Sequence, residues 1–306
     1  VITSKTKSFC SGHIKVGDMK FHCWNKLGHG SVNVIDAIAQ SCDVFFYEIA
    51  LKTGINNIAK ISREFGLGLP TGLNLPGEKG GLIPDRDWKL REKQKVWRPG
   101  ETIIAGIGQG YVLASPLQLA VMAARIASGK VVEPRIIKRV NGVEQKIPNQ
   151  LKLDIDPNAL GIIRSGMYEV SNGIKGTARK SKIAISEISM AAKTGTSQVR
   201  NITSKERATG VIPNEKLPYN RRDHALFVGF APYNQPKYAI AVVVEHGGGG
   251  SKVAAPIARD IMLRALYEKI PPLEAYPEEQ RAKIAKRLKN LKLNPVLKPN
   301  LNKGNA

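Results

Sequence analysis

Apolar residues recur at intervals of three and four along several stretches of the chain, which is the spacing of one buried face of an α-helix. Ser115-Pro116 and Asp156-Pro157 each put a capping residue and a helix-compatible proline directly before such a stretch. Near the end of the chain, two continuous apolar runs flank Pro232-Tyr-Asn-Gln-Pro236, which is typical of two strands joined by a hairpin. The pattern predicts helices over 31–39, 44–51, 55–65, 117–127, 158–170 and 253–267, strands over 225–231 and 237–245, and a strand and hairpin over 131–140.

Two intervening stretches have the composition of loops. Residues 66–110 are rich in Gly and Pro and end in Gly106-Ile-Gly-Gln-Gly110, whose glycines do not have the spacing of a phosphate-binding loop. We therefore expect no nucleotide site there. Residues 199–222 form a polar stretch longer than ordinary connections, and loops of that length are often lids or binding elements.

The end of the chain differs in composition from the rest. From residue 271 onward it is rich in Pro and Lys and contains one basic helical stretch, 281–292. We expect a folded domain over 1–268, followed by a flexible, basic tail over 269–306.

Length and charge narrow the classes of protein further. The chain has 306 residues, 42% of them hydrophobic, which is enough for a substantial core, and no apolar run approaches the roughly 18 to 20 residues of a membrane span. Lys and Arg number 47 against 25 Asp and Glu, a net charge of +22. Because no helix groups these cations with aromatic side chains as single-strand binders do, we interpret them as a solvated basic surface and expect no nucleic-acid partner.

All three cysteines lie in the first 42 residues, with a histidine between the last two. Cys10, Cys23, His29 and Cys42 together offer the Cys3His ligand set of a closed tetrahedral zinc site. Their spacing is wider than in a zinc finger, and a disulfide with one buried thiol left over is the alternative in an oxidising compartment. His13 and His22 are rival ligands, but Gly on both sides of His29 lets its ring reach inward.

The segment 190–198 contains the most distinctive chemistry. A small, apolar lead-in delivers Lys193, Thr194, Gly195 and Thr196 in succession, and we place them on a strand edge. Strand alternation sends Lys193 and Gly195 to one face and the two threonines to the other, and the glycine lets another segment approach the backbone closely. Such an edge can offer a bound acyl group a cation, hydroxyls and a free N–H. Alone, however, Lys-Thr-Gly is also an ordinary strand end.

A second polar group, Ser41-Cys42-Asp43, lies between two predicted helices, where it can project into a cleft. Taken alone, a helix junction with Ser or Asp as the N-cap explains this triplet as well.

Together these segments resemble the class B penicillin-binding proteins, and within them the elongation transpeptidases of the penicillin-binding protein 2 group. The resemblance covers about residues 1–266. It rests on the order of several motifs, of which Lys-Thr-Gly is a known signature of penicillin-binding proteins. These motifs are Gly28-His-Gly30, Ser41-Cys-Asp-Val-Phe-Phe-Tyr47, Gly106-Ile-Gly-Gln-Gly110, Lys193-Thr-Gly-Thr-Ser-Gln-Val199 and Phe230-Ala-Pro-Tyr233.

The resemblance implies an α+β fold: an antiparallel five-stranded sheet with helices on both faces and a mainly helical lobe beside it. It implies serine acyl transfer that cross-links peptidoglycan stem peptides ending in D-Ala-D-Ala, which β-lactams imitate. Ser41 then corresponds to the proton-relay serine, with Asp43 where many relatives have Asn, and Lys193 assists both relay and substrate carboxylate. Thr194 and Thr196 suit that carboxylate, and the Thr196 N–H suits an oxyanion hole.

The resemblance also favours zinc over the disulfide at Cys10, Cys23, His29 and Cys42, with one ion per chain. It implies β-lactams, a glycosyltransferase and other elongation proteins as partners, and the periplasmic face of the bacterial inner membrane as the location.

The chain differs from the family at the nucleophile, which lies in a Ser-x-x-Lys motif. The one such sequence is Ser4-Lys5-Thr6-Lys7, and the residues after it do not form the helix that the motif requires. We therefore expect the domain to be truncated at its N-terminal side, without the membrane anchor and pedestal of the family, and inactive alone.

Two other functions remain open. One is a non-catalytic split or decayed fragment that acts as a binding piece, and the other is a β-lactamase, for which no deacylating carboxylate can be named. The acyl-transfer interpretation depends on one geometric expectation: Lys193 and Ser41 face one another across one groove.

Overall fold

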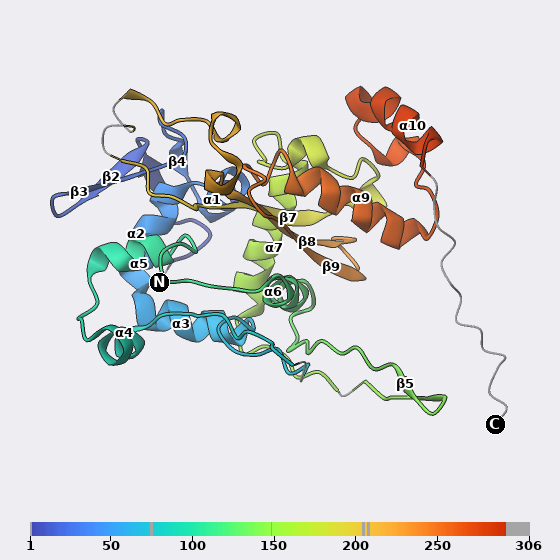
Figure 1. The fold of residues 1–306 in the computed structure, drawn as a ribbon, viewed down its shortest axis with the longest axis horizontal. Helices are drawn as coiled ribbons and strands as arrows, with labels where there is room; N and C mark the ends of the chain where they lie inside the picture. The colour runs from blue at the N-terminus through green and yellow to red at the C-terminus, as the bar shows by residue number, and fades with distance from the viewer. Residues whose placement is uncertain (1, 74–75, 148, 204–205, 207–208, 292–306) are drawn as a thin grey trace.

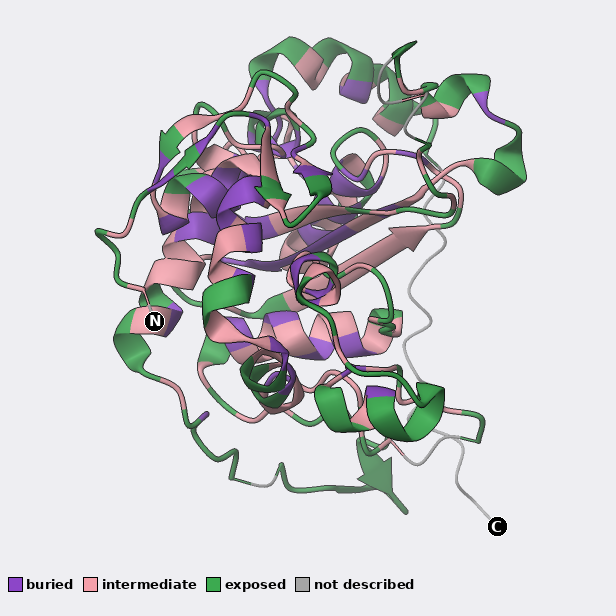
Figure 2. Cartoon of the chain, turned by 90° about the vertical axis from the view of Figure 1, so that its left-hand side faces the viewer, coloured by how far each residue is buried: buried purple, intermediate pink, exposed green. Residues whose placement is uncertain are grey.

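The computed structural model describes residues 2–73, 76–147, 149–203, 206 and 209–291 (Figure 1). Buried residues gather along one sheet and the helices that face it (Figure 2). No helix within the described ranges has the length and apolar character needed to span a bilayer.

A three-stranded antiparallel sheet forms the centre of the molecule. Its order is β7 (Ala191–Ser197), β8 (His224–Ala231) and β9 (Tyr238–Val244). The register pairs Lys193 with Val228, and Val228 with Ala241. β8 is the central strand and its last five residues are all buried, which explains its nearly continuous apolar sequence. The α+β class is therefore confirmed, but the sheet that we expected to have five strands has three in the described residues.

Helices cover both faces of this sheet (Figure 1). α9 (Ala254–Tyr267) packs against β8 and β9. α6 (Pro116–Ser128) packs on the same two strands from the other side, and α7 (Pro157–Asn172) packs against β7. Ser115 and Asp156 cap α6 and α7 with their side chains, as their positions before proline predicted.

A mainly helical lobe lies beside the sheet. It contains α1 (Val34–Gln40), α2 (Asp43–Thr53) and α3 (Ile55–Glu64). α1 also packs along α7, which fixes the lobe against the sheet layer. The expected helices at 44–51 and 55–65 are thus confirmed. The helix expected over 31–39 is confirmed from Val34 onward, whereas Ser31 and Val32 belong to strand β4 (Gly30–Val32).

The lobe also contains two helices that the sequence pattern missed. We expected residues 66–110 to be mainly loop, but α4 (Arg86–Lys93) and α5 (Pro99–Ala105) form within them. Asp85 caps α4 by accepting from the Trp88 N–H, and Lys89 pairs with Glu101 across the two helices. Both helices are short and lie among Gly and Pro, so their apolar period is too brief to detect.

Several short hairpins surround the main layers. β1 (Ser8–Cys10) pairs with β4 (Gly30–Val32), and β2 (His13–Val16) pairs with β3 (Met19–His22). The strand expected over 131–140 is confirmed only at its end, where β5 (Arg139–Val140) pairs with β6 (Val143–Glu144).

The start of the expected tail is folded onto the domain. Residues 273–289 form two 3₁₀ turns and α10 (Arg281–Lys289), with Ala275, Tyr276 and Ile284 buried. The buried Arg259 guanidinium lies 4.9 Å from the centre of the Tyr276 ring. A flexible tail is therefore wrong for residues 271–291, residues 292–306 lie outside the described residues, and the domain boundary at 268 stays a prediction.

Candidate active site and metal centre

Lys193 and Ser41, 152 positions apart in sequence, meet directly: the Lys193 Nζ donates to the Ser41 Oγ. It also donates to the Thr194 carbonyl at 2.9 Å. The expected juxtaposition of the two segments is confirmed, and a cation lies in hydrogen-bond contact with a serine hydroxyl.

Ser41 reaches this place because the chain turns sharply between two helices. It ends α1 in the left-handed conformation, with φ 53° and ψ 50°, and α2 begins two residues later at Asp43. The triplet does lie at a helix junction, but neither Ser41 nor Asp43 is the N-cap of α2, because Cys42 takes that position and Ser41 is the C-cap of α1. Positive φ is uncommon for a residue other than Gly, so surrounding contacts must hold this conformation.

The third member of the triplet, Asp43, is a half-buried carboxylate beside these groups. Its Oδ2 accepts from the Trp24 backbone N–H at 2.8 Å. Burial raises the pKa of Asp43 to about 7, although the Trp24 N–H acts in the opposite direction. Burial likewise lowers the pKa of Lys193 to about 8, against the opposing influence of the Asp43 charge. Both groups can therefore exchange a proton near neutral pH.

The open edge of β7 presents backbone groups. The Thr194 carbonyl faces Lys193, and the Thr196 carbonyl accepts from Gln109 Nε2 at 3.0 Å. In an antiparallel strand the N–H and C=O of one residue point to the same side. The Thr196 N–H therefore also points to the open edge, as an oxyanion donor requires.

The side chains of β7 differ in what they can offer. Thr194 projects to the face opposite Lys193, where its hydroxyl lies 2.8 Å from the Thr177 hydroxyl, so it already has a protein partner. Thr196 is exposed. Gly250 approaches the strand so closely that a Cβ there would lie 2.3 Å from the Gly195 carbonyl oxygen. The glycine that permits this approach is Gly250, because a Cβ on Gly195 would meet only the Leu226 Cβ, at 3.3 Å.

The three cysteines and one histidine converge on one point. Ligand atoms of Cys10, Cys23, His29 and Cys42 all lie within 4.8 Å of one another, and the cysteines are free and buried. His29 Nδ1 lies 3.6 Å from Cys10 Sγ and 3.5 Å from Cys23 Sγ. A tetrahedral zinc with ordinary bond lengths puts S and N ligands about 3.5 Å apart, so the donors fit that ion.

The thiols also differ in acidity. A hydrogen bond from Cys42 lowers the pKa of Cys23 to about 4, and the same contact together with burial raises the pKa of Cys42.

The rival ligands His13 and His22 pair with each other in the β2–β3 hairpin, with ring centres 6.2 Å apart, and are not members of the cluster.

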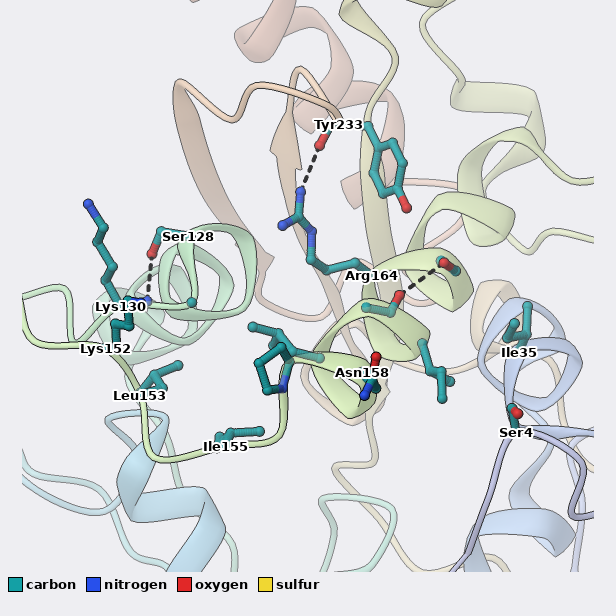
Figure 3. Close-up of a pocket in the computed structure, with 16 residues that line it drawn as sticks. Ser4, Ile35, Ser128, Lys130, Lys152, Leu153, Ile155, Asn158, Arg164 and Tyr233 are labelled. Carbon is teal, nitrogen blue, oxygen red and sulfur yellow. Dashed lines mark hydrogen bonds between the residues drawn. The ribbon is translucent and has the colours of Figure 1, made fainter.

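A cavity of about 830 Å³ lies elsewhere, beside the start of α7 (Figure 3). Arg164 projects into it and donates to the Tyr233 carbonyl at 3.0 Å. Ser4 is on its rim and lies in a turn before β1, so Ser4 and Lys7 do not share a helix. None of the predicted site residues except this doubtful serine lines the cavity.

Three residues that connect the parts of the site were not singled out from the sequence. Thr177 donates its N–H to the Ala39 carbonyl and contacts Thr194, so it joins the end of α1 to β7. Gln109 and Trp24 contact β7 and the Ser41 turn. Gln109 stands in a motif that carried the resemblance, whereas nothing in the local pattern marks Thr177 or Trp24.

Comparison with known proteins agrees with this geometry. The family described as penicillin binding protein transpeptidase domain matches residues 1–263. The chain is 35% identical to peptidoglycan D,D-transpeptidase MrdA of Haemophilus influenzae over 295 residues, covering 93% of this chain and 44% of that protein. It is 38% identical over 254 residues to the protein of that name from Acinetobacter baumannii, covering 80% of this chain and 37% of that one.

Solved structures give the same picture. Penicillin-binding protein 2 of Helicobacter pylori, in complex with MreC, is similar with a TM-score of 0.74 and 39% identity over 87% of this chain and 46% of that one. Penicillin-binding protein 2 of Pseudomonas aeruginosa has a TM-score of 0.74 and 37% identity, over 90% of this chain and 60% of that one. The chain spans less than half the length of the two curated relatives.

Proposed function

The chain belongs to the penicillin-binding protein transpeptidase family, and on that basis we propose that it is the C-terminal part of a peptidoglycan D,D-transpeptidase domain. Its reaction is serine acyl transfer between stem peptides during cell elongation. A serine attacks the D-Ala-D-Ala bond, D-alanine leaves, and an amine of a neighbouring stem takes the acyl group.

The contact between Lys193 and Ser41 carries this proposal. A lysine whose pKa lies near 8 can hold or release a proton at its Nζ, and Ser41 can pass that proton to the leaving amine. Asp43, with its raised pKa, stands where it can modulate the charge on both. This arrangement suits acyl transfer, which requires protons to move at the nucleophile and at the leaving group.

The strand edge supplies the substrate contacts. We assign the Thr196 N–H to the oxyanion, a kind of donor worth roughly 3 to 4 kcal/mol in other acyl-transfer enzymes. Lys193 and the exposed Thr196 hydroxyl suit the terminal carboxylate of the stem peptide, and Gly195 keeps the edge free of a side chain. For Thr194 we propose a supporting role instead, because its hydroxyl is bonded to Thr177.

We further propose that Cys10, Cys23, His29 and Cys42 hold one structural zinc ion. Three buried cysteines and a half-buried histidine, whose ligand atoms all lie within 4.8 Å of one another, support this assignment, and such an ion supplies folding free energy rather than chemistry. Because Cys42 directly follows Ser41, these ligands fix the turn that presents the relay serine.

The nucleophile is assigned to no described residue. Ser4 is unsuited to it, since Ser4 lies in a turn and Lys7 lies outside any helix.

The penicillin-binding protein 2 of Helicobacter pylori has been solved with MreC. On this likeness we propose elongation proteins, among them a glycosyltransferase, as partners, and the periplasmic face of the inner membrane as the location.

Covalent labelling with fluorescent penicillin tests the proposal. The full-length gene product is expected to label, and Lys193→Met to reduce the labelling rate at least about 100-fold. Lys175→Met is the matched control, because Lys175 is an exposed lysine that leads into the same strand. A full-length protein that folds but takes no label would contradict acyl transfer and favour the non-catalytic binding piece.

A further inference from the structure

We infer that Trp24 is a positioning residue for Ser41, acting through both of its N–H groups. This inference rests on the proposed function, in which Ser41 relays a proton. It assigns a role to a side chain that neither contacts Lys193 nor contributes a ligand atom to the cysteine cluster.

The indole binds the end of the helix that carries Ser41. Its Nε1–H donates to the Ser41 carbonyl oxygen, with 2.8 Å between Nε1 and O, and to the Gln40 carbonyl oxygen, with 3.1 Å. The last four carbonyls of a helix have no partner within the helix, so these are groups in need of a donor. One indole N–H thereby serves two of them.

The backbone N–H of the same residue binds the other side of the turn. It donates to Asp43 Oδ2 at 2.8 Å, at the first residue of α2. Trp24 therefore spans Ser41, with one contact at its own carbonyl and one at the carboxylate two residues later. Trp24 therefore holds both sides of a residue whose left-handed backbone needs support from its surroundings.

Core packing does not account for this tryptophan. Trp24 remains 61% exposed, whereas the large side chains of the core are almost wholly buried. An indole that is exposed but has its N–H directed inward contributes mainly through that N–H and through its edge contact with the His29 ring, 5.4 Å between centres. Trp24 also directly follows Cys23, so it links the loop of the cysteine cluster to the Ser41 turn by a route independent of Cys42.

Trp24→Phe removes the indole donor and keeps an aromatic ring and the backbone N–H. Trp97→Phe is the matched control, because the Trp97 Nε1–H also donates one hydrogen bond, to Thr102 Oγ1 at 2.8 Å, within the helical lobe. In Trp24→Phe we expect amide exchange at residues 41–43 to accelerate about tenfold, while exchange in the β7–β9 sheet stays unchanged. Trp97→Phe is expected to leave residues 41–43 unaffected.

The reaction supplies the second measurement, on the full-length gene product. Trp24→Phe is expected to slow maximal acylation by penicillin about tenfold with half-saturation unchanged, because Ser41 is displaced but the β7 edge is intact. Replacing Trp24 by benzothienylalanine, which has the same shape without the N–H, is expected to give the same loss.

Three results would overturn the inference. They are unchanged exchange at residues 41–43, faster exchange throughout the molecule, and normal acylation despite local loosening. A wild-type protein that takes no penicillin would instead refute the proposed reaction, while the exchange measurement would still decide whether Trp24 holds the turn.

Discussion

At the scale of single residues, burial determines the chemistry of the site. Lys193 and Asp43 are both half-buried, and their pKa values approach one another, to about 8 and about 7. An exposed pair of these types would titrate far apart, near their ordinary values. The position of Lys193 on a strand could be predicted from the sequence. The shifted pKa values could not, because they depend on the packing of segments that lie about 150 positions apart, such as Lys193 against Ser41.

Lys193 predicts a specific pH dependence. Its pKa falls from 10.5 to about 8 on folding, so between these values the unfolded chain binds more protons than the folded one. The stability that Lys193 contributes is therefore lowest below about pH 8 and rises as the pH increases toward 10.5. Relative to Lys193→Met, the free energy of unfolding should increase across this window by on the order of 3 kcal/mol.

Denaturant unfolding of both proteins at several pH values measures that difference, and Lys175→Met provides the comparison for an exposed lysine. A difference in the free energy of unfolding that stays flat from pH 8 to 10.5 would show that folding does not lower the pKa of Lys193.

At the scale of elements, the first 43 residues are held together by side chains more than by long strands. β1 and β4 have three residues each, and their ends carry Cys10 and, one residue before β4, His29. Cys42 caps the start of α2 without a side-chain hydrogen bond. Such short strands are marginal on their own, so a metal at this junction would add to the packing of α2 on β1 and to the hydrogen bonds of Trp24.

Metal analysis and chelation test this arrangement. The purified chain is expected to contain about one zinc per molecule, and Cys42→Ala to lose it. His13→Ala is the control, because His13 lies in the neighbouring hairpin outside the cluster. Chelation should loosen residues 8–43 to proteolysis while α9 and the sheet stay protected. Absence of metal together with a mapped disulfide would end the idea.

The helices and strands show what sequence patterns can and cannot establish. α6 and α7 were predicted to within two residues because proline and a capping side chain mark their starts. α4 and α5 were missed because each is shorter than three turns, which is too short for an apolar period to show in the sequence, although α5 buries Ile103 and Ala105 and Lys89 pairs with Glu101 between the two helices. The Cys3His set could be predicted because all three cysteines and a histidine, which are the residue types that bind zinc, occur within residues 10–42.

At the scale of the whole molecule, the C-terminal segment packs against residues 180–184, which precede β7. Ala184 donates its N–H to the Ala275 carbonyl, and Gln280 donates to the Lys180 carbonyl. Arg259, buried in α9, donates to Gln280 and lies on Tyr276. Composition alone suggested a flexible tail, because the proline and lysine content hid the few buried side chains that anchor it.

This closure predicts that residues 271–291 stabilise the site from a distance. A chain ending at residue 270 lacks Gln280 and Tyr276, so Arg259 keeps its ion pair with Asp260 but loses its other two contacts. It also loses the buried Ala275 and Ile284, and removing buried apolar side chains is destabilising. We expect its melting temperature to fall well below that of a chain ending at residue 291. Tyr276→Ala alone should cost about 3 kcal/mol or more, as for other buried aromatic side chains. Thermal unfolding of the two truncated chains measures the effect, and equal melting temperatures would mean that this segment only rests on the domain.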